Sequence, residues 1–154
     1  MNDKARVQFI LQANMHLVLS TADASGKPWV TPVAYNFDNE NSLYWESSKN
    51  SRHSTNIRAR KEIAIVIYMF KPSKDALYIE AEAKELVDEA EIAQAIDVIN
   101  TRPSPEKYRI KKPSDVSGPA SWRIYKAVPK ITYVRKGIVT GGQAITVRRK
   151  IASH

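Results

Sequence analysis

The chain of 154 residues contains no cysteine, only five glycines and no long apolar run. The absence of cysteine excludes disulfides, thiolate catalysis and zinc or iron–sulfur sites with Cys ligands. No glycine-rich phosphate loop is present. No segment approaches the roughly 18 apolar residues that a membrane span needs, and residues 1–6 lack the apolar stretch of a secretion signal. These absences predict a cytoplasmic protein that does not enter a membrane.

Histidine is also scarce, and its distribution excludes further chemistry. The three histidines are His16, His53 and His154. Their spacing is not that of metal ligands, and they form no recognisable Ser–His–acid set. We therefore predict no metal site, and the sequence identifies no catalytic acid or base.

The charge is unbalanced, with 24 Lys and Arg against 16 Asp and Glu and a net charge of +8. This field favours anionic partners, which include phosphate cofactors, nucleic acids and acidic surfaces. The basic residues form small separate clusters at 58–61, 109–112 and 148–150. A nucleic-acid face usually adds exposed aromatics or a recognition helix, and neither accompanies these clusters. We therefore do not expect a nucleic-acid partner.

Hydrophobic patterning predicts a single, mainly β domain of the α+β class spanning residues 1–154. Alternating or continuous apolar runs predict strands at 16–22, 29–37, 42–47, 63–70, 76–87 and 122–135. Helices are predicted at 4–13, 51–61 and 89–100. Tight turns between the first strands favour antiparallel pairing, so a six-stranded antiparallel barrel with short flanking helices fits better than a parallel sheet. Residues 138–154 are predicted to form a loosely ordered tail.

The most informative segment is 45–54, where a strand ends and a helix begins. Hydroxyl and cationic side chains gather there: Ser47, Ser48, Lys49, Ser51, Arg52 and His53. Helix starts bind phosphate because their first N–H groups lack partners and carry partial positive charge. Cations are unfavourable at this end of a helix unless an anion accompanies them, and a guanidinium such as that of Arg52 can contact two phosphate oxygens. The pattern predicts a phosphate site, although a serine cap with exposed cations fits it equally well.

A second feature is Thr31-Pro32-Val33 within the second strand. Proline cannot donate to a sheet ladder, so it marks an edge, a bulge or the end of pairing. Unpaired backbone groups there could bind the polar rim of a flat heterocycle, and a simple edge strand is the alternative. Trp29, Tyr35 and Trp45 could stack on such a ring or belong to the core.

At these residues the sequence resembles the pyridoxamine 5′-phosphate oxidase-like family of FMN-binding split β-barrels. The similarity runs from about Asn14 to Leu86, with motifs at 26–33 (GKPWVTPV), 43–45 (LYW) and 51–57 (SRHSTNI). The last motif is specific for a branch of the family. The resemblance implies a homodimer with two FMN sites at its interface.

The resemblance also implies roles for individual residues. Ser47, Ser51, Arg52 and His53 would hold the phosphate, with Lys49 in support. Thr31, Pro32 and Val33 would run along the isoalloxazine, Asn56 would support the site, and Trp122 is a candidate to complete the pocket. Family members also bind a deazaflavin or haem. Because Ser-Arg-His at a helix start suits one terminal phosphate, we predict FMN, with deazaflavin or haem as alternatives.

The predicted function is that of an FMN-dependent oxidoreductase acting on a small-molecule substrate. The alternative is a non-catalytic flavin-binding carrier or sensor. The true oxidase of the family has a C-terminal substrate-recognition segment with Arg and His positions, and residues 137–154 contain no counterpart. We therefore do not predict vitamin B6 oxidation.

Overall fold

A computed structural model describes residues 1–71 and 74–151. Its strands form one antiparallel sheet in the order β2-β1-β5-β6-β7-β4-β3, with β8 paired to β7. The strands are β1 (His16–Ala22), β2 (Pro28–Ala34), β3 (Asn36–Phe37), β4 (Leu43–Ser48), β5 (Glu62–Met69), β6 (Asp75–Glu85), β7 (Trp122–Thr140) and β8 (Gln143–Lys150). The helices are α1 (Asp3–Ala13), α2 (Arg52–Ala59) and α3 (Glu89–Asn100), with 3-10 turns at Glu106–Tyr108 and Pro113–Asp115.

The mainly β, α+β architecture is confirmed, but the described residues form eight strands where the sequence predicted six. One difference lies at Tyr35, where the predicted strand 29–37 divides into β2 and β3. The Tyr35 side chain is buried, and its hydroxyl donates to the Leu11 carbonyl oxygen at 2.9 Å. This bond to α1 accompanies the break between the two strands.

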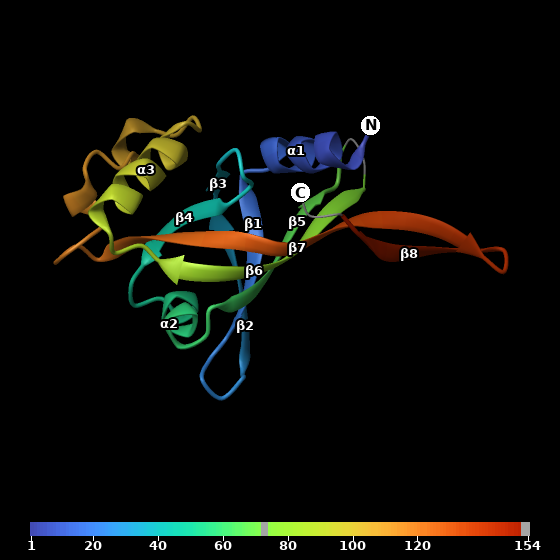
Figure 1. Ribbon diagram of the computed structural model, residues 1–154, viewed down its shortest axis with the longest axis horizontal. Helices are drawn as coiled ribbons and strands as arrows, with labels where there is room; N and C mark the ends of the chain where they lie inside the picture. Colours follow the sequence, from blue (N-terminus) through green and yellow to red (C-terminus); the bar gives the residue numbers. More distant parts are fainter. Residues whose placement is uncertain (72–73, 152–154) are drawn as a thin grey trace.

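The second difference is the C-terminal hairpin. The prediction of a loosely ordered tail is wrong for residues 138–150, which form the end of β7, a two-residue turn and β8, and which pair as a hairpin. Gly141 and Gly142 adopt positive φ angles of 58° and 77°, which glycine tolerates and which a two-residue hairpin turn requires. The β7–β8 ribbon extends well away from the rest of the sheet (Figure 1). Residues 152–154 of the predicted tail lie outside the described residues.

The main core fills the interior of the curved sheet. Alternate residues of the strands point inward, among them Leu17 and Leu19 of β1 and Ile65 and Ile67 of β5. Trp45 of β4 stacks on Tyr125 of the neighbouring β7, with ring centroids 5.8 Å apart. Helix α1 adds Val7, Ile10 and Leu11 to this core, as its apolar stripe predicts.

A second core lies beneath α3. Ile92, Ala95 and Ile96 of this helix are buried with Tyr44 of β4 and Ile124 of β7. Val116, from the segment between α3 and β7, belongs to the same cluster. Within the described residues, no helix is both long and apolar enough to cross a membrane.

The arrangement of β4, α2 and β7 determines where the candidate residues lie. β4 leads directly into α2, which packs against β1, β2 and β6 (Figure 1). β7 pairs with β6 on one side and with β4 on the other. Its pairing with β6 shifts register near Pro129, whose missing N–H suits an interruption of the ladder. The long β7 therefore joins the end of β6 to the turn between β4 and α2.

Candidate functional site

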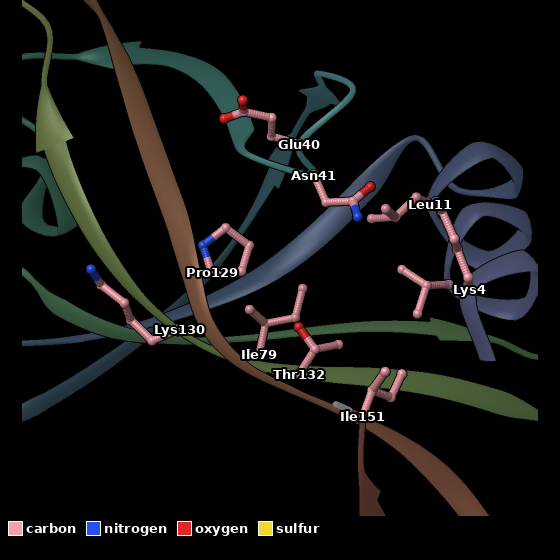
Figure 2. Close-up of a pocket in the computed structure, with 10 residues that line it drawn as sticks. Lys4, Leu11, Glu40, Asn41, Ile79, Pro129, Lys130, Thr132 and Ile151 are labelled. Atoms are coloured by element: carbon pink, nitrogen blue, oxygen red, sulfur yellow. The ribbon is translucent and has the colours of Figure 1, made fainter. Parts of the chain in front are cut away.

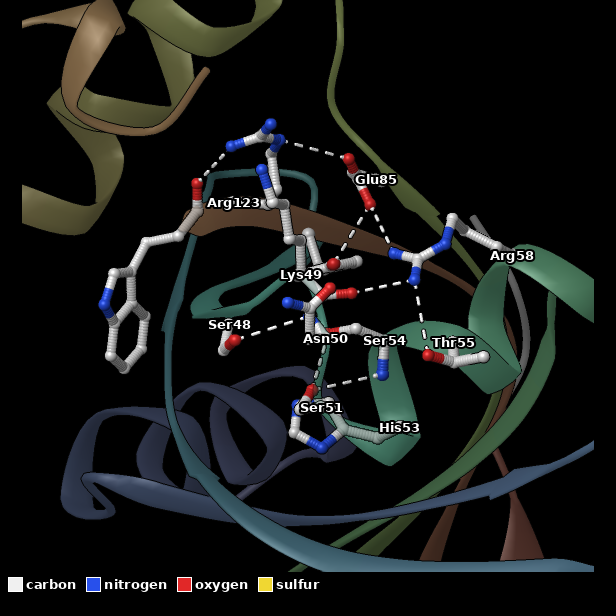
Figure 3. Close-up of polar contacts among 12 residues, drawn as sticks. Ser48, Lys49, Asn50, Ser51, His53, Ser54, Thr55, Arg58, Glu85 and Arg123 are labelled. Carbon is white, nitrogen blue, oxygen red and sulfur yellow. Dashed lines mark hydrogen bonds and ion pairs between the residues drawn. The ribbon is translucent and has the colours of Figure 1, made fainter. Parts of the chain in front are cut away.

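The turn between β4 and α2 has the structure that the sequence predicted. Ser51 is the N-cap of α2, and its Oγ accepts a hydrogen bond from the Ser54 N–H at 3.3 Å. The preceding residues close the turn, because the Ser51 N–H donates to the Ser48 carbonyl at 3.0 Å. The Asn50 N–H also lies 3.3 Å from the Ser48 Oγ (Figure 3). The hydroxyls and free N–H groups of a helix start are thus gathered at one place.

His53 connects two of the predicted hydroxyl groups. Its Nε2 lies 2.8 Å from the Ser47 Oγ and 3.1 Å from the Ser51 Oγ. Burial lowers the pKa of His53 below its usual value, because desolvation disfavours the imidazolium. A neutral imidazole therefore orients the two hydroxyls, and the structure brings Ser47, Ser51 and His53 together as predicted.

Arg52 takes a different direction from His53. Its guanidinium lies over the indole ring of Trp29 on β2, 4.5 Å from the ring centroid. Among the ion pairs of the described residues, none involves Arg52 or Lys49. The Asp23 carboxylate accepts hydrogen bonds from Ser25 and Lys27 in its own turn, which lower its pKa, and the charge of Arg52 makes a smaller contribution in the same direction. The start of α2 therefore carries cations without a carboxylate partner in this part of the chain.

The Thr31–Val33 segment lies on β2, at one end of the sheet order. This placement confirms that Pro32 occupies an edge strand, as its missing N–H predicted. Pro32 is exposed and Thr31 half-buried, whereas the Val33 side chain points into the core. Val33 can therefore reach a ligand only through its backbone. Since α2 packs against β2, this edge and the start of the helix lie on the same side of the molecule.

Two other predicted residues have structural surroundings of their own. Asn56 is buried, and its Nδ2 donates to the Thr21 Oγ1 at 2.9 Å, which ties α2 to β1. Trp122 is opposite Ser48 in the β4–β7 register, and 51% of its surface is exposed. Asn56 thus supports the helix that carries Arg52, and Trp122 has a free face beside the turn.

Sequence reasoning missed a cluster of charged residues behind the turn. Glu85, the last residue of β6, accepts a hydrogen bond from the Arg58 Nη1 at 2.9 Å and another from the Tyr125 Oη at 3.0 Å. Its other carboxylate oxygen lies 3.3 Å from the Arg123 Nε. These residues come from three elements far apart in the sequence, so no local sequence pattern predicts that they contact one another. The only local indication of this cluster is the position of Arg58, which directly follows the SRHSTNI motif.

A partly open pocket lies elsewhere in the molecule. It has a volume of about 250 Å³ between α1 and β7, with Leu11, Ile79, Pro129 and Thr132 in its lining (Figure 2). None of the predicted site residues lines it. The described residues also form no group of three or more His, Asp or Glu side chains that could hold a metal. The candidate site is therefore an open surface formed by the start of α2 and the edge of β2.

Comparison with known proteins identifies both a family and a fold. The family model for pyridoxamine 5′-phosphate oxidase matches residues 3–117 of the chain. No protein of curated function matches the sequence.

Solved structures with similar folds include flavin-binding and haem-binding proteins. An FMN-binding protein from Nostoc punctiforme, related to pyridoxamine 5′-phosphate oxidase, is 12% identical over 97% of this chain and 98% of its own, with a TM-score of 0.65. The haem storage protein of Vibrio cholerae is 18% identical over 84% and 92%, with a TM-score of 0.66. A haem-binding protein from Mycobacterium smegmatis is 15% identical over 96% and 59%, with a TM-score of 0.67. At these identities the likeness shows the fold, which is a split barrel.

Proposed function

Because the chain belongs to the pyridoxamine 5′-phosphate oxidase family, we propose that it is a flavoprotein that binds FMN by its phosphate at the start of α2. The observation that carries this proposal is the pair of cations, Lys49 and Arg52, at a helix N-terminus without an ion-pair partner in the described residues. An isolated cation at this end of a helix is unfavourable, and a bound anion removes the penalty.

The donors present fit a phosphate monoester. Phosphate oxygens accept hydrogen bonds, and the turn gathers the first N–H groups of α2 with the hydroxyls of Ser47 and Ser51. The Ser51 hydroxyl donates to the Ser54 Oγ at 2.7 Å in this structure, so it would turn toward a bound phosphate. Arg52 adds a charged two-point donor. In this proposal His53 stays neutral and holds the two serine hydroxyls in place, and Lys49 contributes charge from the turn.

The ring of the cofactor would lie along the edge of β2. Pro32 is exposed there, Thr31 is half-buried, and the backbone of Val33 extends the edge. When bound, the isoalloxazine supplies hydride or electron transfer. The residues of the chain bind and orient it, since none of the assembled side chains is placed as a general acid or base. We therefore propose an oxidoreductase of a small-molecule substrate, with a non-catalytic carrier or sensor as the second candidate.

We also propose that a second copy of the chain completes the site. The start of α2 and the edge of β2 are open, and Trp29, Val30 and Trp122 beside them are exposed. Large apolar side chains gathered at an open polar site are typical of a surface that another protein covers. A homodimer with the cofactor at its interface would both close the open site and cover these exposed apolar side chains.

Haem is the competing ligand, because two of the structural neighbours are described as haem proteins. A haem iron requires an axial ligand such as a histidine. The Nε2 of His53 contacts two serine hydroxyls, whereas the first N–H groups of α2 and the cations Lys49 and Arg52 are suited to phosphate. The local chemistry therefore favours FMN.

The absorption spectrum of the purified protein tests the proposal. A flavoprotein should absorb near ~450 nm and bleach with dithionite, because the oxidised isoalloxazine carries that band. A Soret band would indicate haem, and a colourless protein that gains no spectrum with added FMN would contradict the proposal. Anaerobic reduction by NAD(P)H or a reduced deazaflavin then separates an oxidoreductase from a carrier.

A further inference from the structure

We propose that Glu85 is a positioning residue of this site, which acts through Arg58 and Arg123 to hold the β4–α2 turn in the form that binds phosphate. The inference rests on the proposed FMN function and concerns residues that the family motifs do not assign. Glu85 itself lies behind the turn, at the end of β6, where it is 17% exposed (Figure 3).

Arg58 connects Glu85 to the front of α2. Its Nη1 donates to the Glu85 carboxylate, while its Nη2 donates to the Lys49 carbonyl oxygen at 2.7 Å and to the Thr55 Oγ1 at 3.3 Å. The guanidinium therefore reaches from the last turn of α2 back to Lys49, which lies two residues before the N-cap Ser51. Because Lys49 is one of the predicted phosphate-binding residues, this bond fixes the backbone from which its side chain extends.

Arg123 connects the same carboxylate to the segment before β7. Its Nη1 donates to the carbonyls of Ala120 and Trp122 at 2.7 and 2.8 Å, and its Nη2 donates to the Gly118 carbonyl at 2.7 Å. Ser121, within this segment, accepts a hydrogen bond from the Lys49 N–H at 2.9 Å. Lys49 is thus held at both its N–H and its carbonyl, once through each arginine.

Glu85 is the common element of these two connections. It is the carboxylate with which Arg58 and Arg123 form ion pairs in the described part of the chain. The Glu85–Arg123 pair is largely buried, with side chains 17% and 12% exposed, whereas Arg58 is 44% exposed. Loss of one partner from a buried pair leaves the remaining charge uncompensated. Removal of the Glu85 charge should therefore release both guanidinium groups and loosen the turn.

Electrostatics alone predicts that loss of the Glu85 charge changes phosphate binding in the direction opposite to loss of positioning. Removing a negative charge near an anion site strengthens anion binding by Coulomb attraction. Loss of positioning weakens it. The sign of the change in FMN affinity therefore separates the two roles.

The test is the affinity of the full-length protein for FMN and for riboflavin, measured by fluorescence titration for wild type and Glu85→Gln. Riboflavin lacks the phosphate, so it reports on the rest of the pocket. We expect FMN affinity to fall about tenfold in the variant, the scale of change seen when a group that orients a ligand-binding residue is lost. Riboflavin affinity should stay within about twofold of wild type, since the phosphate-binding turn does not contact it.

Asp75→Asn provides a matched control. Asp75 is the first residue of β6, as Glu85 is the last, and it forms a 2.6 Å ion pair with Arg6 in which the two side chains are 11% and 23% exposed. Breaking this pair should lower stability without changing the ratio of FMN to riboflavin affinity. If Glu85→Gln does not fold, Glu85→Asp keeps the charge but shortens its reach and should reduce the same ratio.

Each outcome has a defined meaning. Unchanged or stronger FMN binding in the folded variant overturns the positioning role, and so does an equal loss for FMN and riboflavin. A wild-type protein that binds both compounds equally overturns the proposed phosphate site and this inference with it. A wild-type preference for FMN that survives in Glu85→Gln overturns the inference alone.

Discussion

The two ends of helix α2 each carry an arginine, and the two arginines differ in every relevant respect. Arg58, in the last turn, donates to the Glu85 carboxylate, the Lys49 carbonyl and the Thr55 hydroxyl. Arg52, in the first turn, lies over the Trp29 ring and forms no ion pair within the described residues. The helix dipole favours a cation such as Arg58 in the last turn and disfavours a cation such as Arg52 in the first turn. Arg58 therefore has a structural role, and Arg52 has the surroundings of a ligand-binding group.

The C-terminal hairpin shows that clustered charge alone does not make such a site. Arg149 of β8 pairs with Asp3 at the start of α1. Arg148 lies over the Tyr78 ring at 4.5 Å. The Asp3 carboxylate thus accounts for Arg149. Arg148, like Arg52, contacts an aromatic ring and forms no ion pair within the described residues, but it lies on a strand and not at a helix N-terminus. The net charge of +8 becomes informative only when each cation is examined for its neighbours.

The largest expected effect comes from a residue remote from both ends of α2. Ile96→Ala should lower the free energy of unfolding by about 2–5 kcal/mol, because it leaves a cavity in the core beneath α3. Ile96 is 8% exposed there. Urea denaturation measures the change, and titration of the folded variant should show unchanged FMN affinity. Loss of flavin binding by the folded variant would mean that the α3 layer shapes the site.

Arg52→Ala addresses the first turn of α2 directly. We expect FMN affinity to fall by about 1–3 kcal/mol, the range for a hydrogen bond to a charged group. Arg60→Ala is the control, since Arg60 is an exposed arginine just past the other end of the helix that donates to the Ala24 carbonyl at 3.1 Å. Equal affinities for wild type and Arg52→Ala would remove Arg52 from the phosphate site.

Trp29→Leu should lower FMN affinity by less than Arg52→Ala does. The indole holds the Arg52 guanidinium by a cation–π contact, which contributes about 0.5–1 kcal/mol at an exposed site. Isothermal titration with FMN should show a loss of that size, and it should disappear when Trp29→Leu is added to Arg52→Ala. Additive losses in the double variant would show that Trp29 acts independently of the arginine.

The smallest effect concerns the pH dependence of stability. Burial lowers the pKa of His53 in the folded protein, so the unfolded chain binds a proton more readily than the folded one. The contribution of neutral His53 is therefore complete above about pH 6.5, its usual value, and is lost as the pH falls toward the lower folded value. Wild type should lose more stability than His53→Gln between pH 8 and 5. Parallel pH profiles would place the imidazole in contact with solvent.

Local patterns were sufficient to predict most of the fold. Alternation identified the strands, and the change of period at Ser51 placed the start of α2 correctly. The division at Tyr35 was not predictable, because it depends on a bond to α1 from a residue 24 positions away. The β8 strand was missed because its exposed, basic sequence resembles a tail, although Gly141-Gly142 is a recognised hairpin signal.

Some residues of the candidate site were likewise predictable from local sequence, and others were not. Ser47, Ser51 and His53 lie within one strand–helix turn, so the sequence predicted that they gather there. It did not predict the contacts of the imidazole with the two hydroxyls. Arg123 reaches that turn through the pairing of β7 with β4, and Glu85 through the pairing of β6 with β7, neither of which a local pattern specifies. Sequence reasoning named the groups that we propose contact the phosphate, and it missed Glu85 and Arg123, which lie behind the turn.

A crystal structure of the protein grown with excess FMN tests the central claim most directly. The account predicts the phosphate at the N-terminus of α2, within hydrogen-bond distance of the Ser47 and Ser51 hydroxyls and beside the Arg52 guanidinium. A phosphate bound elsewhere, or a carboxylate of the protein in that position, would contradict it.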